Sequence, residues 1–183
     1  MITAAVLALL WMLHTAPARA DLRISDLDIY LNDHEVTVHV VLLGALPDAL
    51  HEGIQSGIPA HVRLVIELWQ YQRMLPDRML ITKTVERTLA YNVVTREFKV
   101  AAVQGETRPV FTTRDLRDAQ RVLSDIRGVK MTPAATLDPA AVIYVRVQAE
   151  TALNGENTFV ARMNGTAEQT ARQSDYRTIQ RVQ

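Results

Sequence analysis

Apolar and polar residues alternate along most of this chain with a period of two, which is typical of β-strands. The alternating runs cover residues 36–42, 62–68, 79–91, 94–100 and 141–149. Two cations, Lys83 and Arg87, interrupt the apolar face of the third run. Because each run has one apolar and one polar face, the pattern predicts antiparallel sheet with one face against a core and the other in water.

A change of parity marks the segment before these runs. Leu22 and Ile24 share one parity, whereas the apolar residues after Asp26 have the other. One extra residue at Ser25 or Asp26 would cause this change, so we predict a β-bulge there. The polar residues 32–34 then predict a hairpin turn.

Two segments interrupt the strands with helical spacing. Residues 47–56 begin with a proline and predict a short surface helix. Residues 113–127 predict a longer helix, with Thr112 or Thr113 as its N-cap and Gly128 as its stop signal. An apolar stripe supports the second helix and consists of Leu116, Ala119, Leu123 and Ile126.

The pattern weakens after the second helix. Residues 130–139 contain Pro133 and Pro139 and predict a loop. A last strand is predicted at 157–163, and the polar residues 166–183 predict a tail that is mobile at its end. The whole pattern predicts one domain over 21–165. We expect an antiparallel β-sandwich or flattened barrel of roughly six to eight strands with two short helices.

The N-terminal segment has the composition of a signal peptide. Residues 2–13 are apolar, Pro17 follows, and Ala18-Arg19-Ala20 places small residues at the positions that signal peptidase requires. We therefore predict cleavage after Ala20, although no Lys or Arg precedes the apolar run. The run is shorter than the about 20 residues that span a bilayer, and an uncleaved anchor in the inner membrane is the alternative. We expect a periplasmic protein without a stable membrane span after cleavage.

Composition excludes several classes of function. The chain has no cysteine, which excludes thiol catalysis, thiolate metal sites and a lipid anchor at a lipobox cysteine. Without Arg19, 19 basic residues face 20 acidic ones. No nucleic-acid partner is expected, because such partners need a strongly basic face.

Charge is unevenly distributed along the sequence, since residues 21–60 carry one Arg and seven acids while 61–130 carry 13 basic residues and eight acids. The simpler interpretation of this uneven charge is that the charged residues lie on strand faces exposed to water. The alternative is that the charge makes the molecule dipolar, so that it orients toward a charged surface.

No catalytic motif stands out. The sequence contains no glycine-flanked nucleophilic serine, no phosphate loop and no dinucleotide-binding fingerprint. His39 and His61 would form a metal site with Glu67 only if their strands pair, and solvent-facing histidines are the simpler interpretation. Nothing singles out two of the 20 acids as a glycosidase pair. We therefore predict no catalytic residue, no cofactor and no metal ligand.

One short aromatic stretch is the best candidate for a binding surface. Trp69 and Tyr71 lie on the strand face opposite Leu64, Ile66 and Leu68. The cations of the neighbouring strand would stack against Trp69 or pair with Glu67. The predicted binding surface consists of Trp69, Tyr71, Lys83 and Arg87. Packing of the aromatic residues between a sheet and a helix is the alternative.

A further pattern lies between Gly57 and Val100. Its recognisable residues are Gly57-Ile58-Pro59, Trp69, Arg73-Met74-Leu75-Pro76-Asp77-Arg78, Arg87-Thr88-Leu89-Ala90-Tyr91 and Thr95-Arg96-Glu97-Phe98. This pattern resembles the proteobacterial domain of unknown function 4390 family, a family of exported proteins. The resemblance implies a Gram-negative envelope protein without an assigned activity, and it carries no catalytic residues. Arg87 and Tyr91 share a strand face, where a carboxylate would hold Arg87 while Tyr91 packs.

Two functions follow as hypotheses. The first is non-enzymatic binding of another envelope protein, a peptide or a membrane-surface component, with a free sheet edge available for strand addition. The alternative is a carrier of a small apolar ligand, or a hydrolase with an unrecognised site, whose pocket lies between the sheet and helix 113–127. A deep apolar cavity would favour the carrier, whereas clustered carboxylates or histidines with shifted pKa values would favour the enzyme.

Overall fold

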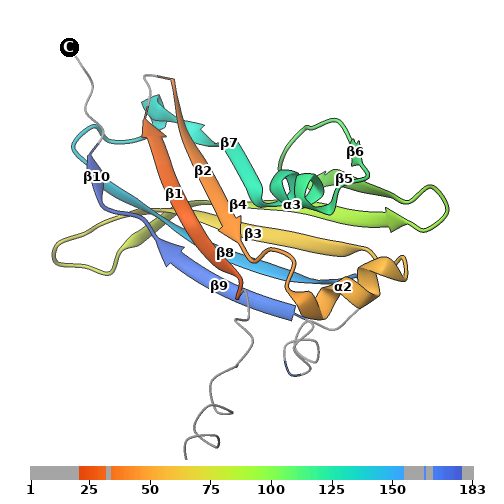
Figure 1. Cartoon of the computed structure of the whole chain (residues 1–183). Helices are drawn as coiled ribbons and strands as arrows, with labels where there is room; N and C mark the ends of the chain where they lie inside the picture. The colour runs from red at the N-terminus through yellow and green to blue at the C-terminus, as the bar shows by residue number, and fades with distance from the viewer. Residues whose placement is uncertain (1–20, 32–33, 155–162, 164–166, 179–183) are drawn as a thin grey trace, which may run out of the picture.

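The computed structural model describes residues 21–31, 34–154, 163 and 167–178 of the chain. The predicted signal peptide lies outside these residues, as do most of the predicted turn at 32–34 and of the predicted strand at 157–163. Within the described part, two antiparallel sheets face each other and two α-helices pack against them. The predicted mainly β class is therefore confirmed, and a sandwich of two open sheets, rather than a closed barrel, is the form that it takes (Figure 1).

The smaller sheet has three strands in the order β1-β2-β7. Its strands are β1 (Arg23–Leu31), β2 (Glu35–Leu43) and β7 (Asp125–Pro133). The predicted bulge in the first strand is confirmed, because the register between β1 and β2 shifts between Ile24 and Asp26. The extra residue turns Leu27 and Ile29 toward the same face as Leu22 and lets them pack against the core.

The larger sheet has seven strands in the order β10-β8-β3-β4-β5-β6, with β9 also paired to β8. Its strands are β3 (Ala60–Gln70), β4 (Arg78–Asn92), β5 (Glu97–Gln104), β6 (Phe111–Thr113), β8 (Val142–Leu153), β9 (Ala167–Gln173) and β10 (Arg177–Thr178). We call its face toward the smaller sheet the inner face and the opposite one the outer face. The hairpins β3–β4 and β4–β5 project at opposite ends of this sheet (Figure 1).

The hydrophobic core lies between the two sheets. Alternate residues of β2 and β3, such as Val38 and Leu64, are almost completely buried and belong to one cluster with the inner residues of β8. The short helix α2 (Asp48–Gln55) confirms the prediction for 47–56 and adds Leu50 and Ile54 to this cluster. Alternation of burial along each strand therefore places the polar positions on the two outside faces.

The second helix is shorter than predicted. α3 spans Leu116–Ser124, and its N-cap is Asp115, whose side chain accepts a hydrogen bond from the Arg117 amide at 2.7 Å. Thr112 and Thr113 belong to β6 instead, and β7 begins at Asp125 directly after the helix. Ile126 carries the apolar spacing beyond the helix because it points into the core from the strand β7. The apolar spacing therefore continues from α3 into β7, and it gives no sign that the helix ends at Ser124.

The predicted stop signal at Gly128 has a different role. Val38 pairs with Val129 and Val40 with Ile126, so two residues of β7 lie opposite one residue of β2. Gly128 has a φ of 71° and supplies the left-handed conformation that such a bulge requires. The glycine thus bends a strand rather than ending a helix.

Three other segments differ from their predictions. The strand predicted at 94–100 begins only at Glu97, because residues 93–96 form the turn between β4 and β5. β7 runs through residues 130–133, where a loop was predicted, and a short 3-10 helix, η1 (Ala134–Thr136), follows it. The predicted tail 166–183 contains β9 and β10, which extend one edge of β8.

β9 joins the edges of the two sheets. The Leu22 amide donates to the Glu168 carboxylate at 2.6 Å, and Arg172 donates to the backbone carbonyls of Ile24 and Ser25. These contacts explain why the inward positions of β9 are polar: they face the backbone of β1 rather than the apolar core. The edge formed by β1 and β9 is therefore bridged by side chains.

Candidate functional site

The four residues of the predicted binding surface lie on two faces of the larger sheet. Trp69 is on the outer face, and Tyr71 follows β3 with its ring exposed. Lys83 pairs with Ile66, which belongs to the core, and Arg87 pairs with the core residue Val62, so both lie in the rows of the inner face. The structure therefore brings together Trp69 and Tyr71 but separates them from Lys83 and Arg87.

Arg87 is a buried structural residue. Its side chain is 2% exposed and forms an ion pair with Glu106, to which Nη2 donates at 2.8 Å. Nη1 also donates to the carbonyls of Val122 and Asp125, at 2.9 Å for Asp125. The expectation that Arg87 would stack on Trp69 or pair with Glu67 is wrong. The expectation that a carboxylate would hold it is confirmed, and through the two carbonyls it anchors the end of α3 to the sheet.

An aromatic cluster occupies the outer face where β3 and β8 approach the β3–β4 hairpin. The rings of Trp69 and Tyr144 lie nearly parallel with centroids 6.4 Å apart, and Tyr176 meets Tyr144 edge-on at 5.1 Å. Tyr71 extends the cluster through an edge contact with Tyr176 at 5.4 Å. We call these four residues, Trp69, Tyr71, Tyr144 and Tyr176, the aromatic cluster.

Arg146 and Glu67 hold the exposed side of Trp69. The Arg146 guanidinium lies 4.6 Å from the centre of the Trp69 ring and 5.3 Å from that of Tyr144, which is the geometry of a cation–π contact. The Trp69 indole donates to the Glu67 carboxylate at 2.9 Å. Because Arg146 itself is exposed, the cluster presents a cation and aromatic edges to solvent.

Asp77 ties the hairpin to the cluster. The buried hydroxyl of Tyr144 donates to one carboxylate oxygen of Asp77 at 2.7 Å, and the Gln72 amide donates to the other at 3.1 Å. These two hydrogen bonds, the one from Tyr144 first, hold the pKa of Asp77 below its ordinary value. Burial, and after it the bond to Asp77, raises the pKa of Tyr144 to about 12.

The chemistry of this pair is structural rather than catalytic. Tyr144 stays protonated at neutral pH and Asp77 stays ionised, so neither is poised to exchange a proton with a substrate. Tyr144 has no exposed surface and cannot reach a ligand. The arrangement instead fixes the position of the rings and of the hairpin.

The histidines do not meet. His39 belongs to the smaller sheet and contacts the ring of Tyr30 at 4.5 Å, whereas His61 belongs to the larger sheet and hydrogen-bonds Asn154 at 2.8 Å. The metal site considered for His39, His61 and Glu67 is therefore not formed. Within the described ranges, no group of three or more His, Asp or Glu residues is placed to hold a metal ion.

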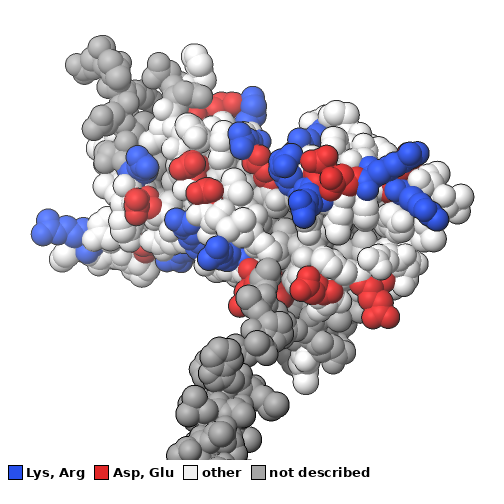
Figure 2. All heavy atoms as spheres, viewed as in Figure 1, with Lys and Arg blue, Asp and Glu red and all other residues white. Residues whose placement is uncertain are grey.

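The uneven charge of the sequence is visible on the surface. Figure 2 shows Lys and Arg side chains gathered around β5, β6 and α3, and acidic side chains near α2. Several of the cations are paired with acids, as Arg121 is with Asp118 and Arg114 with Glu97. On the face that Figure 2 shows, acidic side chains thus lie among the basic ones, and the expected absence of a nucleic-acid partner stays a prediction.

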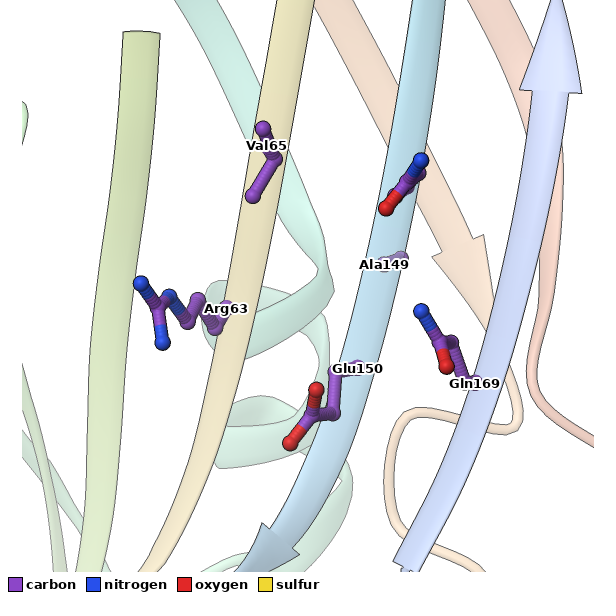
Figure 3. A pocket seen from close by; sticks show the side chains of 6 residues that line it. Arg63, Val65, Ala149, Glu150 and Gln169 are labelled. Atoms are coloured by element: carbon purple, nitrogen blue, oxygen red, sulfur yellow. The ribbon is translucent and has the colours of Figure 1, made fainter. Parts of the chain in front are cut away.

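A shallow groove lies on the outer face beyond the aromatic cluster (Figure 3). Its volume is about 260 Å³, and it is lined by Arg63, Val65, Gln148, Ala149, Glu150 and Gln169. Arg63 comes from β3, Glu150 from β8 and Gln169 from β9, so three adjacent strands contribute to it. The lining combines a guanidinium, a carboxylate and amide groups with the apolar Val65 and Ala149, which suits an extended ligand that carries both polar and apolar groups.

Sequence reasoning missed Tyr144, Arg146, Tyr176 and Asp77. Tyr144 sits in an apolar run and Arg146 in the polar alternation of the same strand, so neither stands out along the chain. They meet Trp69 because β8 pairs with β3 across a long sequence separation, with Trp69 opposite Tyr144. Asp77 belongs to the pattern that resembles the family, and nothing else in the sequence marked it as a residue of the site.

Comparison with known proteins gives one match. Residues 19–154 match the family model described as Domain of unknown function (DUF4390). No curated protein and no solved structure matches the chain significantly. In the part of the chain that the structure describes, no helix is both long and apolar enough to cross a membrane.

Proposed function

The chain belongs to the family described as Domain of unknown function (DUF4390), and from that premise we propose that it is an exported, non-enzymatic binding module of the bacterial envelope. Its partner is an extended segment of an envelope protein or peptide, which binds to the outer face of the larger sheet. The observation that carries this proposal is the aromatic cluster, held in place by Arg146, Glu67 and Asp77.

The residue types of the cluster support a binding role. Trp, Tyr and Arg are the residues most enriched among those that dominate binding energy at protein interfaces. In this protein Trp69, Tyr71 and Arg146 are already fixed by ring contacts and a hydrogen bond. A partner would therefore lose little side-chain entropy of the site on binding, which favours affinity.

The groove extends this surface along the strands. Arg63 and Trp69 lie on the same face of β3, six residues apart, which corresponds to roughly 20 Å of strand. Between them, Glu67 and Arg146 are neighbours across β3 and β8. An extended peptide of about six residues would cover the distance, with its backbone near the amides and charges and a side chain against the rings.

The carrier and hydrolase hypotheses gain no support from the described residues. The groove lies on the outer face and is lined by charged and amide side chains as well as apolar ones, whereas a carrier was expected to hold its ligand between the sheet and the second helix. Ala119 and Leu123 of α3 pack into the core at that place. Asp77 and Tyr144, whose pKa values are shifted, hydrogen-bond each other, and the third group with a shifted pKa, Arg127, pairs with Asp125; none of the three lines the groove.

Site-directed photocrosslinking tests the proposal. A photoreactive residue in place of Gln148, in the groove, should capture a specific envelope protein in cells, and Arg146→Ala should abolish that crosslink. Lys99→Ala is the matched control, since Lys99 is an exposed cation on the outer face of β5. Melting curves of the variants verify folding. A crosslink that survives Arg146→Ala, or that both variants reduce equally, would contradict the proposed surface.

Export is tested separately by N-terminal sequencing of the protein recovered from the envelope. An N-terminus at Asp21 would support cleavage after Ala20. Retention of Met1 would refute cleavage, and recovery of the chain only in the cytoplasm would refute the envelope location itself.

A further inference from the structure

The β3–β4 hairpin ends in an apolar tip that has no cover within the described residues. Met74 is 90% exposed and Leu75 is 68% exposed, and both lie in the turn that joins β3 to β4. In Figure 1 this turn projects beyond the smaller sheet, away from the body of the molecule. Two large apolar side chains at a projecting turn are unusual for a surface that meets only water.

Hydrogen bonds on both sides of the turn fix it to the larger sheet. The Tyr71 amide donates to the Val142 carbonyl at 2.9 Å, and Asp77 receives the Gln72 amide and the Tyr144 hydroxyl. Both ends of the turn are therefore fixed to the sheet.

The exposed side chains change from apolar to aromatic with distance from the tip, and cations lie around both groups. Behind Met74 and Leu75 come the exposed rings of Tyr71 and Tyr176, which contact each other. Exposed guanidinium groups surround these layers, at Arg73, Arg78, Arg146 and Arg177. Of the acids nearby in the sequence, Asp77 in the turn is engaged by two donors, and Asp175 beside Tyr176 is exposed.

The order of apolar tip, tyrosine rings and arginines matches the preferences of these side chains at a membrane interface. Leu and Met side chains enter the acyl boundary, Tyr rings prefer the headgroup level, and Arg is attracted to anionic phosphates. We propose that the β3–β4 hairpin tip docks the protein on an anionic phospholipid surface, with Met74 and Leu75 inserted and the arginines at the phosphates. A protein partner would need a socket for a convex tip, whereas a bilayer adapts to it.

The proposal goes beyond the proposed function, because it needs no protein partner. It also adds a geometric consequence: the groove and aromatic cluster would face along the membrane surface, next to the docked tip. Both the groove and the tip could then be occupied at once, since Met74 and Leu75 lie outside the groove lining.

The opposite hairpin provides a matched control. The β4–β5 turn also carries two exposed apolar residues, Val93 at 58% and Val94 at 91%. The ring pair at its base, Tyr91 and Phe98, packs against the core instead of standing in solvent. This turn therefore has exposed apolar surface of similar kind but lacks the exposed aromatic layer.

A single fluorophore per molecule tests the tip directly, because the chain has no cysteine. Leu75→Cys and, separately, Val94→Cys are labelled with a polarity-sensitive dye in the full chain. Each is mixed with vesicles of phosphatidylethanolamine and phosphatidylglycerol, and with vesicles of phosphatidylcholine alone. We expect a blue shift, and quenching by acyl-chain quenchers, at position 75 on the anionic vesicles, and little change at position 94.

A second variant tests the charge layer. Arg73→Gln combined with Arg78→Gln should reduce the signal from the dye at position 75 by roughly tenfold or more at low salt. Added salt should have the same effect in the unmodified background. Unchanged melting curves show that the fold is retained.

Several results would overturn the proposal. They are equal signals at positions 75 and 94, no signal at 75, or equal signals on anionic and zwitterionic vesicles. A shift at position 75 that occurs only when an envelope protein is added would assign the tip to a protein partner instead. None of these results changes the crosslinking outcome at the groove, so failure of membrane docking and failure of the proposed function are distinguishable.

Discussion

Replacement of Glu106 by Ala is the perturbation with the most clearly defined energetic consequence. Arg87 lies at 2% exposure on the inner side of the larger sheet, and within the described residues it forms its ion pair with Glu106, which is 17% exposed. Two of the guanidinium's donors would lose the carboxylate, while the bonds to the carbonyls of Val122 and Asp125 would remain. The variant therefore leaves a cation in a site that excludes water.

The size of the effect follows from the burial of this pair. Removal of one partner of a buried ion pair costs about 3–5 kcal/mol of the free energy of unfolding, mainly because the remaining charge is uncompensated. For a chain of 183 residues, each 1 kcal/mol lowers the melting temperature by about 2–4 °C. We therefore expect Glu106→Ala to lower the melting temperature by roughly 6–20 °C.

A double-mutant cycle with Arg87→Met separates the ion pair from other losses. Arg87→Met alone removes the charge but leaves two carbonyls at the end of α3 without their donor, at a cost of about 1–3 kcal/mol for each. The double variant should cost less than the sum of the single variants, with a coupling of about 1–3 kcal/mol.

The measurements are urea denaturation followed by circular dichroism, and thermal melting. Arg121→Met is the control, because its ion pair with Asp118 is 74% and 46% exposed and should contribute less than about 0.5 kcal/mol. If Glu106→Ala is no more destabilising than Arg121→Met, the assignment of Arg87 as a buried anchor is refuted.

Three further predictions concern packing, backbone and pH. Gly105→Ala should lower the free energy of unfolding, measured by urea denaturation, by about 2–5 kcal/mol, because φ is +83° and a Cβ would lie 2.1 Å from the Thr84 carbonyl oxygen. Gly128→Ala is the control: φ is +71°, but the space around it is open, so the loss should be only about 1–2 kcal/mol. Leu123→Asp should detach α3 and cause a large loss of thermal stability, since Leu123 is fully buried; an unchanged melting curve would contradict this. The raised pKa of Tyr144, about 12 against about 10 in the unfolded chain, means that its contribution to stability is complete below about pH 10 and is lost as pH rises toward 12. Tyr144→Phe should therefore lose less stability than the unmodified chain between about pH 8 and pH 11, and equal losses would argue against the assignment.

The strands were predictable because their alternation reports directly which side chains face the core. Val38 and Leu64 belong to runs whose inward-facing apolar positions are all buried, and the bulge at Ile24–Asp26 followed from a change of parity alone. The start of α3 was less predictable, since Thr112 or Thr113 was expected as the N-cap, whereas Asp115, closer to the apolar stripe, is the residue that caps the helix. Its end was unpredictable from apolar spacing, because Ile126 continues the stripe from a strand.

β9 could not be predicted from alternation, since its inward side chains are polar. Glu168 and Arg172 face the backbone of β1, and polarity at those positions reflects hydrogen bonds rather than solvent. The aromatic cluster required knowledge of strand order, because Trp69 and Tyr144 become neighbours only through the pairing of β3 with β8. Arg87 was visible as an interruption of an apolar face, but its partner Glu106 was not, because the two meet only after β5 has folded back along β4.

The position of β3 between β4 and β8 has a consequence for the order in which the chain folds. β4 follows β3 through a short turn, whereas Ala60 of β3 pairs with Leu153, near the end of the family match. Local hairpins form in microseconds, but the closure of such a distant pairing is slow, so the second edge of β3 stays bare until β8 has been synthesised. During that interval an apolar strand with an open edge is exposed to aggregation, which makes this stage the one at which a chaperone would be most useful. The second edge of β3 is thus covered only once β8 has paired with it.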